Sequence, residues 1–173
     1  MSEVGLDGKA KSRIPIQREV LNSILAILQE YPRITSLHSY GATAEVLELL
    51  EKTPVRGVVL HWWLGDSRQT ARALELGAYF SVNSSNLKHK EVLAGIPLDR
   101  LLTETDHPDG NRWAPQPRHP GNVSRVESIL GELHGLAPHA FRNKCWSNLK
   151  QLTTEVECAA LLPERVRSIL AEA

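Results

Sequence analysis

The sequence predicts an α/β protein built on a parallel sheet. Short β-branched or apolar runs recur along the chain, and most are followed by a segment with apolar residues at helical spacing. Parallel neighbours need a long crossover connection, which is usually a helix, so this repeated strand-then-helix pattern predicts parallel strands. The 173 residues are enough for one domain with a substantial core. Because the chain shows no internal repeat and no low-complexity linker, we expect a single domain over residues 1–173.

The strands and the helices between them follow in a regular order. Five runs end in polar clusters and are expected to form strands: residues 3–7, 34–38, 57–61, 78–82 and 101–106. Helical spacing of apolar residues predicts helices after the first three runs, around residues 20–28, 46–50 and 71–76. Together these segments form successive βα units of one sheet.

The last third of the chain is predicted to be helical after one long loop. Residues 107–122 contain too many prolines and glycines for a regular element. Two amphipathic patterns follow, over residues 123–133 and 138–152. We expect a final short helix to begin at Pro163, because proline suits the first helical position.

Composition limits the classes of partner. Lysine plus arginine and aspartate plus glutamate both total 20, so the formal net charge is zero and no global field attracts nucleic acid or an anionic membrane. Any phosphate must therefore be held by local groups or by metal ions. The chain has no apolar run near the ~18 residues of a membrane span, and its first residues lack the apolar core of a signal peptide. We therefore expect no membrane partner. With only two cysteines, a reducing, cytoplasmic setting is expected.

Side chains of metal-ligand type fall at or near the ends of the predicted strands. Glu3 lies in the first strand, His38 and His61 end the second and third, and Asp106 closes the fifth. Sites in α/β proteins are built at the carboxyl ends of parallel strands. A single strand-end histidine is more often a hydrogen-bonded or surface group, but four such residues at matching positions favour a metal site. Two imidazoles and two carboxylates suit a divalent ion such as magnesium, manganese or zinc.

Four motifs carry a family resemblance: EVGLD at 3–7, LHSYGA at 37–42, VLHWWLGD at 59–66 and PLDRLLTETDHP at 97–108. In wording and order they resemble the TatD family of metal-dependent deoxyribonucleases, which have an amidohydrolase-like barrel. The resemblance runs from residue 3 to about residue 152 and includes Gln17 and Asn148. It implies a partial TIM (β/α)8 barrel with about five of the eight parallel strands. The GLDG sequence at 5–8 is also similar to the TatD-like component of Qat anti-phage systems.

The resemblance implies an activity and roles for the strand-end residues. The activity is metal-dependent hydrolysis of phosphodiester bonds in DNA, with single strands or strand ends as substrate. Glu3 would be shared between two metal ions, and His38 and His61 would hold the second ion. Asp106 would be a ligand that also positions or activates the attacking water, which makes it the expected catalytic residue.

One departure from the family bears on activity. Family members carry a His-x-His pair on a strand that precedes the glutamate motif, and no His-x-His occurs in these 173 residues. We therefore expect a chain that lacks the first metal's ligands and the N-terminal strands, and whose activity in isolation is in question. Two alternatives stay open. The chain could be a non-catalytic binding or assembly module, or one half of a split hydrolase whose barrel is completed by self-association or by a partner chain.

Residues near the expected ligands have competing interpretations. Glu104 precedes Asp106 by two positions and could orient a metal ligand, or it could form a buried salt bridge that closes the barrel. Trp62 and Trp63 follow His61 and could stack on a nucleobase, with Trp63 as the candidate substrate contact, although packing of one of the two over the strand ends is the stronger interpretation. His107 and Arg112 could contact substrate at the rim of the site, and a solvated loop would explain them as well.

Overall fold

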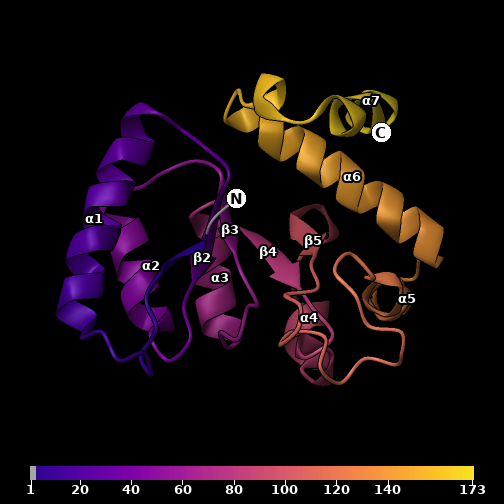
Figure 1. Ribbon diagram of the computed structural model, residues 1–173, viewed down its shortest axis with the longest axis horizontal. Helices are drawn as coiled ribbons and strands as arrows, with labels where there is room; N and C mark the ends of the chain where they lie inside the picture. The colour runs from indigo at the N-terminus through magenta and orange to yellow at the C-terminus, as the bar shows by residue number, and fades with distance from the viewer. Residues whose placement is uncertain (1–2) are drawn as a thin grey trace.

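The computed structural model describes residues 3–173, which form one parallel sheet with helices against it (Figure 1). The sheet has five strands in the order β1-β2-β3-β4-β5, and every neighbouring pair is parallel. The predicted α/β class is therefore confirmed. The strands are β1 (Glu3–Gly5), β2 (Thr35–His38), β3 (Val58–Leu60), β4 (Tyr79–Val82) and β5 (Leu101–Thr103).

Seven α-helices and three short 3-10 helices connect and cover the described strands. In Figure 1, α1 and α2 lie on one side of the sheet, and α6 and α7 lie on the opposite side. The α-helices are α1 (Ile14–Glu30), α2 (Thr43–Lys52), α3 (Ser67–Glu75), α4 (Lys90–Ala94), α5 (Ser124–Leu133), α6 (Pro138–Glu155) and α7 (Glu164–Glu172). The 3-10 helices are η1 (Asn86–Lys88), η2 (Leu98–Arg100) and η3 (Ala159–Leu161).

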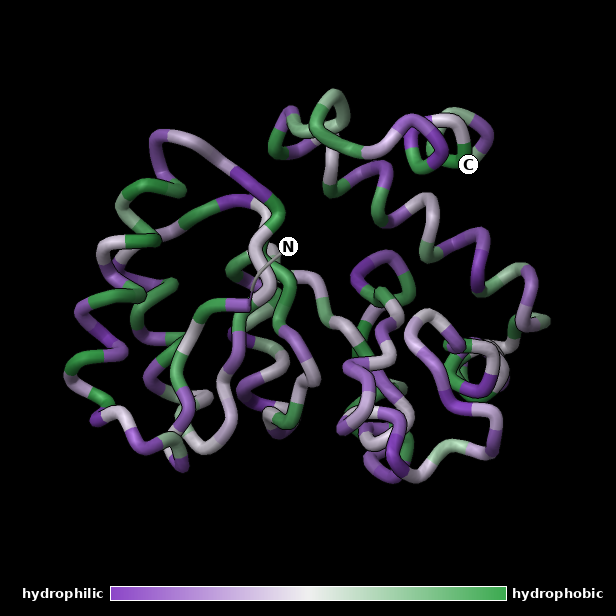
Figure 2. The backbone as a smooth tube through the Cα atoms, viewed as in Figure 1, coloured by the Kyte–Doolittle hydropathy of each residue, from purple (hydrophilic) through white to green (hydrophobic). Residues whose placement is uncertain are grey.

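The longer helices follow from amphipathic sequence and local capping. Along α1 the buried residues Leu21, Leu25 and Leu28 repeat at helical spacing, and Figure 2 shows hydrophobic and hydrophilic residues alternating along its length. The start of α3 is fixed by a capping box, in which the Asp66 side chain accepts from the Gln69 backbone N–H and the Gln69 side chain accepts from the Asp66 backbone N–H.

The sheet is packed on both faces. Successive residues of a strand point to opposite faces, so the fully buried Tyr79 and Phe80 of β4 belong to different apolar clusters. Phe80 joins the main core. Tyr79 packs in a second cluster with Leu152 and Val156, from the end of α6 and the residue that follows it. The end of α6 therefore covers one face of the sheet. Asn148 of α6 donates to the carbonyls of Leu98 and Leu101 at 2.8 Å, which ties this helix to the start of β5.

The glycine that ends the first strand allows β1 and β2 to meet closely. Gly5 has φ +147°, and a Cβ atom there would lie 2.1 Å from the backbone oxygen of His38. Any larger residue would push β1 away from the carboxyl end of β2. Gly5 and His38 are register partners, so this close approach places Glu3 beside the His38 side chain.

Several element boundaries differ from the sequence prediction. The strands are shorter than expected, and His61 and Asp106 lie in the loops after β3 and β5. Residues 83–100, for which no element was predicted, contain η1, α4 and η2. Pro163 is the N-cap of α7, whose first helical residue is Glu164, and α6 continues to Glu155. Within residues 3–173, no helix has the length and apolarity needed to cross a membrane.

Candidate metal centre

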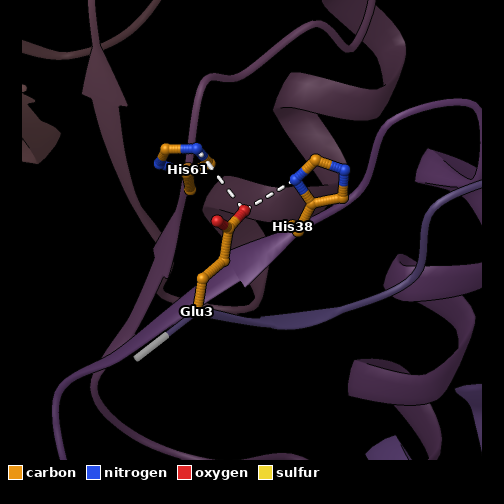
Figure 3. Close-up of side chains that lie close together, drawn as sticks. All are labelled: Glu3, His38 and His61. Atoms are coloured by element: carbon orange, nitrogen blue, oxygen red, sulfur yellow. Dashed lines mark hydrogen bonds and ion pairs between the residues drawn. The ribbon is translucent and has the colours of Figure 1, made fainter. Parts of the chain in front are cut away.

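Three of the expected ligands meet at the carboxyl ends of the first three strands. Figure 3 shows the Glu3 carboxylate between the rings of His38 and His61. Glu3 Oε1 lies 2.6 Å from His38 Nδ1 and 3.4 Å from His61 Nε2. One potential ligand atom from each residue lies within 4.8 Å of the others.

Asp106 approaches this cluster on the His61 side, from the loop after β5. Its Oδ2 lies 3.7 Å from His61 Nε2. Asp106 and Trp62, just beyond β5 and β3, have positive φ values of 42° and 41°, a strained conformation that the surrounding structure must hold in place. Gly110 contributes to this, because its N–H donates to the Asp106 carbonyl at 2.7 Å. A Cβ atom on Gly110 would lie 2.6 Å from the Thr105 oxygen, so only glycine permits this approach.

Glu104 holds His61 in a defined orientation. Its Oε2 lies 2.8 Å from His61 Nδ1 and also accepts from the Ser81 hydroxyl. Its Oε1 accepts from the Trp62 backbone N–H at 3.0 Å and from Asn83 Nδ2 at 3.1 Å. An ionised carboxylate only accepts, so His61 carries its proton on Nδ1 and presents Nε2 to Glu3 and Asp106. No lysine or arginine pairs with Glu104 in residues 3–173, and its side-chain partners are His61, Ser81 and Asn83.

A second carboxylate faces the other imidazole. Asp7 Oδ2 lies 3.5 Å from His38 Nε2, on the side of the ring opposite Glu3. Gln17 of α1 fixes the Asp7 backbone, accepting from its N–H at 2.7 Å and donating to its carbonyl at 3.1 Å. Among the described residues, the buried His38 Nε2 atom forms no hydrogen bond. A contraction of about half an ångström would bring it within hydrogen-bonding distance of Asp7.

The electrostatics of the cluster favour a cation. Burial alone would lower the pKa of His61, but its hydrogen bond to Glu104 and the charges of Glu104, Glu3 and Asp106 raise it above the usual value. Burial raises the pKa of Asp106; His61 opposes this rise, and the charges of Glu104 and Glu3 add to it. Across residues 3–173, no lysine or arginine forms an ion pair with these carboxylates. Two carboxylates and two imidazoles facing one point therefore fit a divalent cation.

A cleft of about 660 Å³ opens over the cluster. Aromatic side chains line it, and Trp113, which is 77 % exposed, is the most accessible of them. The structure corrects the sequence prediction for Trp63, which is 2 % exposed, packs edge-on against Phe80 and donates to Thr70 Oγ1 at 2.9 Å. Its neighbour Trp62 lines the cleft instead.

The remaining rim residues divide between two hollows. His107 is hydrogen-bonded to Asn111, with 3.0 Å between Nδ1 and Oδ1, and lines a separate hollow of about 400 Å³. Arg112 lines both that hollow and the cleft over the cluster, and its guanidinium is bound to Asp109 at 2.7 Å. Lys88 also lines the cleft and was not singled out from the sequence. Its position in the loop after the fourth strand was the available signal, because such loops border the site in this class of fold.

The fold and the cluster together define a class: α/β proteins with imidazole and carboxylate side chains gathered at the carboxyl ends of parallel strands. Residues 1–154 match the sequence profile of the TatD-related DNases. The chain therefore belongs to the TatD family, whose members are metal-dependent hydrolases, some of them named as deoxyribonucleases.

Individual relatives agree with this assignment. The metal-dependent hydrolase YabD of Bacillus subtilis is 28 % identical over 162 residues, covering 88 % of this chain and 64 % of its own. The 3'-5' ssDNA/RNA exonuclease TatD of Klebsiella pneumoniae is 33 % identical over 119 residues, covering 62 % of this chain and 44 % of its own. The crystal structure of the TatD homologue YjjV from Escherichia coli superposes with a TM-score of 0.78 at 28 % identity, covering 87 % of this chain and 62 % of that one. The chain thus spans less than two thirds of the length of these relatives.

Proposed function

We propose that this chain carries the metal-binding strands of a hydrolase that cleaves phosphodiester bonds in DNA. The observation that carries the proposal is the gathering of Glu3, His38 and His61 within 4.8 Å, with Asp106 3.7 Å from His61, beneath an open cleft. These four residues would hold a divalent ion, with magnesium, manganese and zinc as the candidates. When bound, such an ion stabilises negative charge on phosphate oxygens and makes water a stronger nucleophile at neutral pH.

The protein's own residues have separate tasks in this proposal. Asp106 is partly exposed to the cleft and accepts the proton of the attacking water at its carboxylate. Glu104 keeps the proton of His61 on Nδ1, so that Nε2 is free to bind a cation. Asp7 acts in the same way on His38, with its carboxylate facing Nε2 and leaving Nδ1 directed at Glu3.

Relatives support DNA as the substrate. One carries the name 3'-5' ssDNA/RNA exonuclease and another the name deoxyribonuclease Tat-D. The deoxyribonuclease, from Schizosaccharomyces pombe, is 37 % identical over 94 residues. Cleavage of single-stranded DNA or of strand ends is the activity we assign to the site.

The edges of the sheet favour a second possibility, in which the site is completed by additional strands. Within the described residues, β1 and β5 each pair on one side only. Unpaired parallel edges accept further strands. A split hydrolase, with a second polypeptide or a second copy adding strands at β1 and β5, would use the same four ligands. A binding or assembly module would pair with a partner at these strand edges without hydrolysing a substrate.

The test is cleavage of a 5'-labelled single-stranded oligodeoxynucleotide by the purified chain, with magnesium, manganese or zinc supplied separately. We expect metal-dependent release of shorter products, abolished by Asp106→Asn. The matched control is Asp99→Asn, because Asp99 is an exposed carboxylate that does not line the cleft. An absence of turnover with all three metals would favour the binding module, and equal turnover by Asp106→Asn would refute the assigned role of Asp106.

A further inference from the structure

The cleft over the cluster contains two basic side chains whose charges are used differently. Arg112 is bound to Asp109 through Nη2 at 2.7 Å, and its Nε donates to the Asp109 carbonyl at 3.1 Å. Lys88 forms no ion pair with any acidic side chain in residues 3–173. The charge of Arg112 is therefore compensated within the protein, whereas that of Lys88 is available to a ligand.

Buried asparagines hold the backbone that carries Lys88. Lys88 ends η1, which begins at the fully buried Asn86. Asn86 Nδ2 donates to the Trp63 carbonyl at 2.6 Å, and Asn86 Oδ1 accepts from the Asn83 N–H at 3.1 Å. Asn83 is also fully buried, and its Nδ2 donates to Glu104, the residue that orients His61. One buried polar network therefore positions both the Lys88 turn and the metal cluster.

The charge balance of the cleft makes Lys88 important for an anionic ligand. Its lining includes three carboxylates, on Glu3, Asp106 and Asp109, against the two cations Lys88 and Arg112. A divalent ion would reverse this formal balance to an excess of one positive charge. Loss of Lys88 would cancel that excess. Because the whole chain has no net charge, the attraction for a phosphate must come from local groups such as Lys88 and from the divalent ion.

Trp113 supplies an apolar surface at the same cleft. Its side chain is 77 % exposed, although so large an aromatic ring is normally buried against other groups. An unpaired nucleobase can stack on such a ring, whereas a base within a duplex cannot. The cleft thus offers a cation for a phosphate and a flat aromatic surface for a base.

We propose that Lys88 and Trp113 form a binding subsite for one unpaired nucleotide, in which Lys88 contacts the phosphate and Trp113 stacks on the base. This inference rests on the proposed function, since it assigns a substrate contact to the same cleft. It replaces Arg112 with Lys88 as the main phosphate contact expected at the rim. It also makes the subsite selective for single strands.

The test is the binding of a fluorescein-labelled oligothymidylate to the whole chain, measured by fluorescence anisotropy. Calcium is supplied as the divalent ion, and the measurement is repeated at several salt concentrations. Lys88→Gln should weaken binding and reduce the slope of log affinity against log salt by about 0.7, the value for one phosphate contact on a single strand. Trp113→Ala should weaken binding about 5- to 150-fold with an unchanged slope, because stacking involves no counterion release. Lys88→Arg should restore the slope.

Lys90→Gln is the matched control, since Lys90 is exposed two positions away and does not line the cleft. Affinity and slope equal to wild type in Lys88→Gln would overturn the subsite, as would equal losses in Lys88→Gln and Lys90→Gln. A chain that binds the oligonucleotide through Lys88 but cleaves nothing would refute the hydrolase and support the subsite. If the chain cleaves DNA but Lys88→Gln has no effect on binding, the hydrolase is supported and the subsite is refuted.

Discussion

Replacing Glu104 with glutamine tests how the protein prepares His61 for a metal ion. Each Glu104 oxygen accepts two hydrogen bonds, and glutamine keeps the shape but turns one oxygen into an NH2 donor. The NH2 group cannot occupy the Oε1 position, because the Trp62 backbone N–H is a fixed donor there. Asn83 Nδ2 also donates to Oε1, while its Oδ1 already accepts from Ser85 at 3.0 Å.

The NH2 group must therefore occupy the Oε2 position, where both neighbours can adapt. The Ser81 hydroxyl can rotate, and His61 can accept on Nδ1 only by moving its proton to Nε2. The protonated Nε2 would then face Glu3 and Asp106 and could not bind a cation. Loss of such an orienting partner typically lowers metal affinity by about 10- to 100-fold, or roughly 1.4 to 2.8 kcal/mol. We expect a loss of about 1–3 kcal/mol in the free energy of unfolding, from the weakened charge-assisted hydrogen bonds.

Two measurements check this reasoning. Nitrogen-15 NMR of the metal-free protein, at a pH above the raised pKa of His61, should show the neutral ring protonated on Nδ1 in the wild type and on Nε2 in Glu104→Gln. Calorimetric titration with zinc should show the loss of affinity. The control is Glu155→Gln, because Glu155 also accepts side-chain hydrogen bonds but lies at the end of α6. An unchanged tautomer together with wild-type zinc affinity in Glu104→Gln would refute the account of His61.

Three further predictions concern the scaffold. Gly110→Ala would place a methyl carbon 2.6 Å from the Thr105 oxygen, so we expect a loss of about 1–3 kcal/mol in the free energy of unfolding, measured with urea. Burial and a hydrogen bond to Glu155 raise the pKa of Tyr79 above its usual value of 10.0. The folded protein therefore favours the neutral phenol. The contribution of this phenol to stability is fully present below pH 10 and is lost as the pH rises further. Between pH 9 and 11, the free energy of unfolding should therefore fall less in Tyr79→Phe than in the wild type. Burial, with a smaller effect of the Glu127 charge, raises the pKa of Cys145 to about 12, so iodoacetamide at pH 8 should modify this thiol far more slowly in the folded protein than in urea, as mass spectrometry would show.

Each of these predictions has a control and an outcome that contradicts it. Gly95→Ala should be tolerated, since its methyl carbon would lie no closer than 3.4 Å to any neighbour, and equal stability of the Gly95 and Gly110 variants would contradict the crowding argument. Tyr31→Phe is the control for Tyr79, because Tyr31 is 62 % exposed. If Tyr79→Phe and Tyr31→Phe have the same alkaline profile, Tyr79 has no special pH dependence. Alkylation of folded Cys145 at the unfolded rate would show that its thiol is not protected.

The sequence was sufficient to predict the parallel sheet and the gathering of ligand-type residues. His38 and His61 could be expected together because each lies at or just after the carboxyl end of a parallel strand, whereas Glu3 opens β1 and reaches them with its side chain. Asp106 was predicted as part of a strand but lies in a loop with positive φ. That geometry depends on a tight turn in which the Gly110 N–H donates to the Asp106 carbonyl while Asn83, from the loop after β4, packs against Gly110, and the hydrophobic pattern does not reveal this long-range contact.

Other features depend on packing that a single sequence does not reveal. Trp62 and Trp63 are adjacent and chemically alike, and Trp63 is the buried one because it packs on Phe80 and donates to Thr70, contacts that local sequence does not reveal. Lys88 resembles any surface lysine in sequence. Its position over the cleft follows from two buried asparagines and their hydrogen bonds across the sheet.

The central claim is that Glu3, His38, His61 and Asp106 form a binding site for a divalent ion. Equilibrium dialysis of the purified chain against manganese and, separately, zinc measures it directly. We predict one tightly bound ion per chain, with the affinity reduced at least about tenfold in His61→Ala and unchanged in His139→Ala, where an exposed histidine of α6 is removed. Failure to bind either ion, or equal affinity in His61→Ala and the wild type, would contradict the claim.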